Sequence, residues 1–159
     1  MTDTPIALIT GGAQGIGYAC AEALSEDGFE VILADIKADG VTQAAKDLNA
    51  RAGLVCDMGD PVAVNAMFDK IAAEHGPLSA LVNNAGVAMP GDFLDYDLET
   101  FNRVIDINLR GVFIATQRAA RAMVDAGSEG AIVNMSSIIA LVAIPAIPAY
   151  CASKGGVMQ

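Results

Sequence analysis

The chain is poor in basic residues: nine lysines and arginines stand against nineteen aspartates and glutamates among 159 residues, a formal net charge of −10. A surface of this sign offers no attraction for phosphate backbones or anionic lipid, so we expect neither a nucleic-acid nor a membrane partner. With 53% hydrophobic and 18% charged residues, the composition excludes a disordered or fibrous protein. It favours one globular domain over residues 1–159.

Cysteine is also scarce, and its spacing fits neither disulfides nor zinc. Cys20, Cys56 and Cys151 form an odd set without a CxxC pair, so we expect free thiols and no metal site. The first residues lack the basic and apolar regions of a secretory signal. We therefore expect a cytoplasmic protein.

Long hydrophobic runs are missing as well. The longest apolar stretch, residues 138–149, is shorter than a bilayer span of ~20 residues and contains Pro145 and Pro148. It is interpreted as the buried wall of a loop rather than as a membrane helix.

Short β-branched runs alternate with longer helical patterns along the whole chain. This alternation predicts an α/β fold, a Rossmann-like doubly wound parallel sheet, with strands over residues 6–10, 30–34, 53–56, 79–83 and 131–135. Helices are expected over residues 15–27, 41–50, 61–75 and 98–125, and a last one begins near Tyr150. The only histidine, His75, precedes Gly76 and Pro77 and is interpreted as a helix end rather than a ligand.

A glycine-rich turn follows the first strand and leads into a helix, in the sequence Thr10-Gly11-Gly12-Ala13-Gln14-Gly15-Ile16-Gly17. Such a turn lets a pyrophosphate approach the backbone and the N–H groups of the helix N-terminus. A purely structural glycine turn is the alternative. Asp35 ends the second strand, where a carboxylate accepts hydrogen bonds from an adenosine ribose.

Asp35 also bears on the choice of cofactor. Its carboxylate would repel the 2′-phosphate of NADP, and the neutral Gln14 adds no phosphate-binding charge, so NAD is favoured over NADP. Lys37 is the one basic residue beside Asp35.

The glycine spacing resembles that of the classical short-chain dehydrogenase/reductase family. Four later segments match the same family in the same order: Asn83-Asn84-Ala85-Gly86, Asn108 within Ile107-Asn108-Leu109, Ser136-Ser137, and Tyr150-Cys151-Ala152-Ser153-Lys154. The resemblance implies an NAD-dependent oxidoreductase that transfers a hydride between NAD and a secondary alcohol or ketone. Tyr150 and Lys154 lie four apart, so a helix places both on one face, where an ammonium favours ionisation of a phenol.

The resemblance also implies a role for each matching residue. Tyr150 is the catalytic base, Lys154 promotes its ionisation and holds the nicotinamide ribose, Ser137 binds the substrate oxygen, and Asn108 holds a relay water. The implied cofactor-binding set is Gly11, Gln14, Gly15, Ile16, Gly17, Asp35, Asp57, Met58, Asn84, Gly86, Tyr150 and Lys154. Asp57 could equally cap the following helix, although Asp60 before Pro61 is the better cap.

Two features depart from the family pattern. An apolar run, residues 138–142, follows the serine pair, so Ile139 is expected to line a hydrocarbon-binding substrate pocket with Ser137 and Tyr150, unless it fills core or a subunit contact. The family fold also continues beyond residue 159 with further strands and a substrate lid. A molecule that truly ended at Gln159 is therefore expected to bind the adenosine half poorly and to turn over little or nothing.

Two other functions stay open: a nucleotide-binding regulator or fragment without turnover, and a nucleotide-sugar epimerase of the extended branch. The intact Asn108, Ser137, Tyr150 and Lys154 argue against the first, and the glycine spacing argues against the second. The resemblance further implies a homodimer or homotetramer built on the helix of residues 98–125 and on the last helix, burying Phe113.

Overall fold

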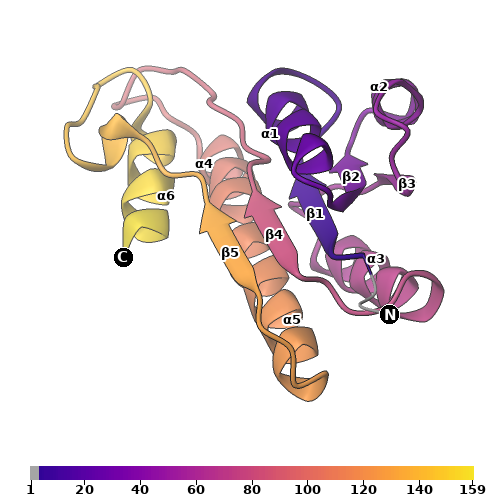
Figure 1. The fold of residues 1–159 in the computed structure, drawn as a ribbon. Helices are drawn as coiled ribbons and strands as arrows, with labels where there is room; N and C mark the ends of the chain where they lie inside the picture. The colour runs from indigo at the N-terminus through magenta and orange to yellow at the C-terminus, as the bar shows by residue number, and fades with distance from the viewer. Residues whose placement is uncertain (1–3) are drawn as a thin grey trace.

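A computed structural model describes residues 4–159. Residues 1–3, part of the N-terminal segment in which no targeting signal is expected, lie outside the described residues. The strands are β1 (Ile6–Thr10), β2 (Glu30–Asp35), β3 (Ala52–Val55), β4 (Ala80–Asn83) and β5 (Ala131–Asn134). All five form one parallel sheet in the order β3-β2-β1-β4-β5, which confirms the predicted α/β architecture (Figure 1).

Helices cover both faces of this sheet. They are α1 (Gly15–Glu26), α2 (Ala38–Asp47), α3 (Pro61–Glu74), α4 (Leu98–Ile105), α5 (Val112–Asp125) and α6 (Pro148–Met158), with a π-helical segment η1 (Asp106–Gly111) and a short 3₁₀ turn η2 (Ile138–Ala140). α1 and α2 pack on one face of the sheet, while α3 and α5 pack against each other on the opposite face. α6 packs against η2, α4 and η1. No helix in the described residues is long and apolar enough to cross a membrane.

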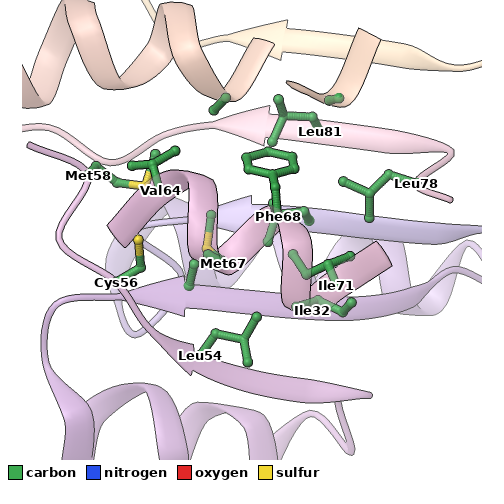
Figure 2. Close-up of a cluster of buried hydrophobic side chains, with 14 of the residues drawn as sticks. Ile32, Leu54, Cys56, Met58, Val64, Met67, Phe68, Ile71, Leu78 and Leu81 are labelled. Carbon is green, nitrogen blue, oxygen red and sulfur yellow. The ribbon is translucent and has the colours of Figure 1, made fainter. Parts of the chain in front are cut away.

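The core explains why the strands are apolar on consecutive positions. Along β1, Leu8 belongs to the cluster shared with α3 and α5, and Ile9 belongs to the cluster shared with α1 and α2. Both side chains are fully buried. Figure 2 shows the first cluster, in which Phe68 and Ile71 of α3 pack against the sheet residues Ile32 and Leu81. A parallel sheet covered on both faces requires this two-sided burial.

Local signals place the ends of α3 as the sequence predicts. The Asp60 side chain accepts a hydrogen bond from the Val62 N–H at 2.8 Å, and Pro61 occupies the first turn. At the other end His75 is the C-cap, Gly76 adopts a φ of 92°, and the His75 Nδ1 accepts from the Arg51 Nε. The interpretation of His75 as a helix end is confirmed.

The helix expected over residues 98–125 is present, but it is not a regular α-helix. Its middle turn, η1, is wound as a π-helix between α4 and α5. Gly111 permits this packing, because a Cβ on it would lie 2.2 Å from the Met58 carbonyl oxygen. π-helical turns often occur at functional sites, and this one carries Asn108.

The expectation that residues 138–149 form a buried wall is wrong for most of the segment. Residues 141–146 are all exposed, and the exposed fraction reaches 67% at Ile138 and 70% at Leu141. Apolar composition predicts burial only where another element covers the side chains, and none among the described residues covers these. Only Ala149, inside α6, is buried.

Candidate active site

The sheet order creates a crevice between β1 and β4. The chain leaves β1 for α1 on one face and leaves β4 toward α4 and α5 on the other, so the two loops diverge at their carboxyl ends. Ligands of open α/β sheets bind at such a point. A cleft of about 470 Å³ lies there, with a volume typical of small-molecule sites.

The cleft brings together nine of the twelve residues assigned to cofactor binding. Its lining includes Gly11, Gln14, Gly15, Ile16, Asp35, Asp57, Met58, Asn84 and Gly86. These come from the loops after β1, β2, β3 and β4, which are far apart in the sequence. Gly17, Tyr150 and Lys154 do not line the cleft.

The glycines of the first loop have different tasks. Gly15 has a φ of 58°, and a Cβ on it would meet no heavy atom within 4 Å, so the backbone there is open to a bound group. Gly17 is buried, and a Cβ on it would lie 2.2 Å from the Gly11 oxygen. Gly17 therefore allows the loop to close on α1, and Gly15 leaves room for a ligand.

Hydrogen bonds from the end of β4 fix the same loop. The Asn84 Nδ2 donates to the carbonyl oxygens of Thr10 and Gly11 at 3.1 and 3.2 Å, and the Asn84 N–H donates to the Thr10 Oγ1. Asn84 thus joins the two loops that form the crevice. Thr10, which the sequence reasoning did not single out, is the acceptor at the centre of this junction.

Asp35 is half-buried at the far end of the glycine loop. Its carboxylate accepts from the backbone N–H groups of Ala13 and Lys37 at 3.1 and 3.0 Å. The Lys37 ammonium lies beside the loop, where it donates to the Gln14 Oε1 at 3.2 Å. These bonds hold one carboxylate and one amine at the edge of the cleft.

Asn108 and α6 form a second cluster, next to the cleft. Asn108 is fully buried, and its amide exchanges two 2.8 Å hydrogen bonds with the backbone of Val87 and donates to the Ser153 Oγ. Both amide hydrogens are therefore used within the protein. A Cβ on Gly86 would lie 3.3 Å from the Asn108 Oδ1 and 3.7 Å from the Lys154 Nζ, so the cleft and the cluster meet at Gly86.

Lys154 is almost completely buried, at 4% exposure. Its Nζ donates to the Met135 carbonyl oxygen at 2.5 Å and lies 5.7 Å from the centre of the Tyr150 ring. Burial lowers the pKa of the Lys154 ammonium. An amine held this way, beside a phenol on the same helix face, can exchange protons with neighbouring polar groups.

The serine pair lies where η2 meets α6. The Ser136 Oγ donates to the Lys154 carbonyl oxygen at 3.0 Å, whereas the Ser137 Oγ accepts from the Ile139 N–H at 3.3 Å. Ser136 is thus engaged with the helix backbone. The half-buried Ser137 retains a hydroxyl hydrogen to donate.

Besides Thr10, sequence reasoning missed two further polar residues of the site. Ser153, fully buried, accepts from Asn108 and donates to the Tyr150 carbonyl oxygen at 2.8 Å. Arg103 lines the cleft and pairs with Asp57. The sequence could have indicated Arg103, because it precedes the lining residue Ile107 by four positions and such positions share a helix face.

Within residues 4–159 no cluster of three or more potential metal ligands occurs.

Comparisons with known proteins agree with this geometry. The family model described as short chain dehydrogenase matches residues 5–159. The chain is 41% identical to D-threitol dehydrogenase of Mycolicibacterium smegmatis over 98% of its length, and 44% identical to cis-4-hydroxycyclohexanecarboxylate dehydrogenase of Sinomonas cyclohexanicum over 96%. It is also 35% identical to an NADP-dependent (R)-specific alcohol dehydrogenase of Lentilactobacillus kefiri, over 96% of this chain and 62% of that protein.

Solved structures give the same result. A solved structure from Sinorhizobium meliloti matches 97% of this chain with a TM-score of 0.89 and 34% identity. That protein is described as a short-chain alcohol dehydrogenase by an unverified assignment. The chain covers 62% of that structure, 61% of the threitol dehydrogenase and 62% of the cyclohexanecarboxylate dehydrogenase. It therefore spans about three-fifths of the length of these relatives. By the match over residues 5–159, the chain belongs to the short-chain dehydrogenase family.

Proposed function

We propose that this chain carries the cofactor site and catalytic residues of an NAD-dependent oxidoreductase acting on a secondary alcohol or ketone. One observation carries the proposal: four separate loops converge on a single cleft beside Gly86, and Gly86 adjoins the buried Asn108 and Lys154. The open backbone at Gly15 and the N-terminus of α1 suit a pyrophosphate. When bound, the nicotinamide supplies or accepts the hydride.

NAD is the proposed cofactor because of Asp35. Its carboxylate, fixed by two backbone N–H groups, suits the two hydroxyls of an adenosine ribose and opposes a 2′-phosphate. Lys37 follows Asp35 by two residues, and its ammonium donates to the Gln14 side chain. One similar protein, the alcohol dehydrogenase of Lentilactobacillus kefiri, is NADP-dependent, so the choice of NAD here rests on Asp35 and not on family membership.

The residues near α6 account for the proton. In alcohol oxidation, Tyr150 takes the hydroxyl proton, and Ser137 orients the same oxygen with its free hydroxyl hydrogen. Lys154 stabilises the ionised phenol and passes the proton outward. Asn108, with its amide held by Val87 and Ser153, fixes the loop after β4 against α6; its predicted relay water stays a proposal.

The apolar segment after Ser137 suggests the substrate class. Ile139 is half-buried beside Ser137, and Ile138 and Leu141 are exposed. Secondary alcohols with a hydrocarbon substituent suit such a surface.

We also propose that the protein forms a homodimer or homotetramer in the cytoplasm. The interface would be formed through α5, on which Phe113 is 63% exposed. Sedimentation equilibrium measures the mass of the assembly.

A Tyr150→Phe variant tests the proposal. NADH formation is followed with a panel of secondary alcohols, and NAD binding is followed separately by calorimetry. Loss of the phenol hydroxyl should lower turnover by about 10²–10⁴-fold or more, because it removes the acid/base group, while NAD affinity stays within about threefold. Cys151→Ser, on the next residue of α6, is the matched control and should retain turnover. Ordinary turnover by Tyr150→Phe would refute the assignment.

A further inference from the structure

Ser153 lies at the centre of a hydrogen-bond chain between η1 and α6. Its side chain is fully buried. Its Oγ accepts from the Asn108 Nδ2 at 3.1 Å and donates to the Tyr150 carbonyl oxygen at 2.8 Å. The chain of bonds therefore connects the π-helical turn to the first turn of α6, which carries Tyr150.

The direction of each bond in this chain is fixed. The Asn108 Oδ1 accepts from the Val87 N–H and the Asn108 Nδ2 donates to the Val87 carbonyl oxygen, both at 2.8 Å. A reversed amide would place donor against donor and acceptor against acceptor, so the second Nδ2 hydrogen points to Ser153. The one hydroxyl hydrogen of Ser153 is then left for the Tyr150 carbonyl oxygen. A methyl group in place of the hydroxyl would leave a buried amide hydrogen unpaired.

Close packing on both sides of the chain of bonds brings α6 to the cleft. A Cβ on Gly156 would lie 2.9 Å from the Leu109 Cδ2, so α6 and η1 are in close contact. A Cβ on Gly86, which lines the cleft, would lie 3.3 Å from the Asn108 Oδ1 and 3.7 Å from the Lys154 Nζ. The Ser153 hydroxyl is thus a polar contact that fixes α6 on η1 directly beside the cleft.

We propose that Ser153 is a positioning residue of the proposed reaction: its hydroxyl, held by Asn108, fixes the first turn of α6 so that Tyr150 reaches the substrate alcohol. Ser153 acts through Asn108 and Tyr150, because its own side chain is fully buried and does not line the cleft. A displaced phenol slows proton transfer more than it weakens binding, since the transfer requires hydrogen-bond geometry. The inference rests on the proposed function, because it presumes that Tyr150 transfers the proton.

Two variants of equal shape separate the hydroxyl from the space that it fills. A threonine in a helix can bond to the carbonyl oxygen one turn earlier, whereas a valine has a methyl group at the same place. Ser153→Thr and Ser153→Val therefore share any cost of the added methyl group. If thermal unfolding shows that both fail to fold, Ser153→Ala, which adds no atoms, is compared with the unmodified chain instead.

Nuclear magnetic resonance of the ¹⁵N-labelled chain tests the hydrogen-bond chain without substrate or cofactor. Both side-chain amide hydrogens of Asn108, assigned by triple-resonance spectra, should be protected from exchange with water in the unmodified chain and in Ser153→Thr. Ser153→Val should shift one of the two resonances and accelerate its exchange by about tenfold or more, because that hydrogen loses its acceptor.

NADH formation with the panel of secondary alcohols tests the positioning role. Ser153→Val should have a kcat lower than that of Ser153→Thr by about tenfold or more, since a small misplacement of a reacting group is costly. The KM for the alcohol and the Kd for NAD, measured by calorimetry, should differ between the two variants by less than about threefold. This separation of kcat from KM is not expected from a serine that only fills space.

Ser128→Val is the matched control. The Ser128 Oγ donates to the Met123 carbonyl oxygen at 3.3 Å, just after α5, and Ser128 does not line the cleft. The variant removes a bond of the same kind, from a serine hydroxyl to a helix carbonyl. It should leave both kcat and the Asn108 amide resonances unchanged.

The outcomes separate the inference from the proposed function. Equal kcat in Ser153→Thr and Ser153→Val would overturn the positioning role, and so would a loss that appears equally in NAD affinity. An Asn108 amide that Ser153→Val leaves unchanged would overturn the hydrogen-bond chain on which the role depends. In each of these cases turnover by the unmodified chain would leave the proposed function in place. No turnover by the unmodified chain with any alcohol of the panel would refute the proposed function and the inference with it.

Discussion

Cys56 illustrates how the cleft changes the chemistry of a single side chain. The residue lies directly after β3, lines the cleft and is only 3% exposed. Burial, together with the neighbouring Asp57 and Asp60 carboxylates, raises the pKa of the Cys56 thiol to about 11. All three causes disfavour the thiolate, which is the reactive form of cysteine.

Cys56 should therefore resist alkylation. At pH 8 its thiolate fraction is about 100-fold below that of a cysteine with the ordinary pKa of 9.0. Iodoacetamide labelling followed by peptide mass spectrometry should modify the partly exposed Cys20 and Cys151 first, and the labelling of Cys56 should accelerate as pH rises toward 11. Labelling of Cys56 at the rate of Cys20 in the folded chain would contradict this account.

For individual residues, the sequence predicted the motif positions but not the side chains that form hydrogen bonds with them. Gly11, Gly15 and Asp35 were predictable because a glycine turn before a helix and a carboxylate after a strand leave local signals. Arg103 and Ser153 were not, since each acts through a partner 46 or 45 residues away in the chain. Only the packing of α4 and α6 against the strand ends reveals these partners.

The π-helical turn η1 is the element that most affects the site. It carries the buried Asn108, and its Gly111 lies against the carbonyl oxygen of Met58, on the loop that lines the cleft. The apolar pattern still repeats every three or four residues through this region, because Val104, Ile107, Gly111 and Ala115 are all buried. That pattern predicts a helix but cannot distinguish a π-helical turn from an α-helical one.

A pair of glycine-to-alanine substitutions tests the role of this turn. Gly111→Ala places a methyl group 2.2 Å from the Met58 oxygen, so we expect a loss of about 1–3 kcal/mol in the free energy of unfolding and weaker NAD binding. Gly155→Ala in α6 meets no atom within 4 Å and should be neutral or stabilise by up to about 1 kcal/mol. Chemical denaturation measures both.

The contrast between the two glycines is the critical result. If the Gly111→Ala and Gly155→Ala variants had the same free energy of unfolding, η1 could not lie as close to the loop after β3 as the structure shows. The same outcome would remove the structural reason for a glycine at that turn.

At the scale of the molecule, the order β3-β2-β1-β4-β5 positions the site. Alternating strands and helices predicted a doubly wound parallel sheet, and its crossover between β1 and β4 brings the loops of four strands to one edge. The exposure of Ile138 and of residues 141–146 was not predictable in this way. Apolar composition describes a side chain, whereas burial depends on which other elements lie against it.

We propose that the crevice between β1 and β4 binds NAD. Calorimetric titration of the purified chain with NAD and with NADP, at fixed ionic strength, tests this claim. We predict saturable binding of one NAD per chain, at least about tenfold tighter than NADP, because the Asp35 carboxylate opposes a 2′-phosphate. Binding of neither dinucleotide, or tighter binding of NADP, would contradict the claim.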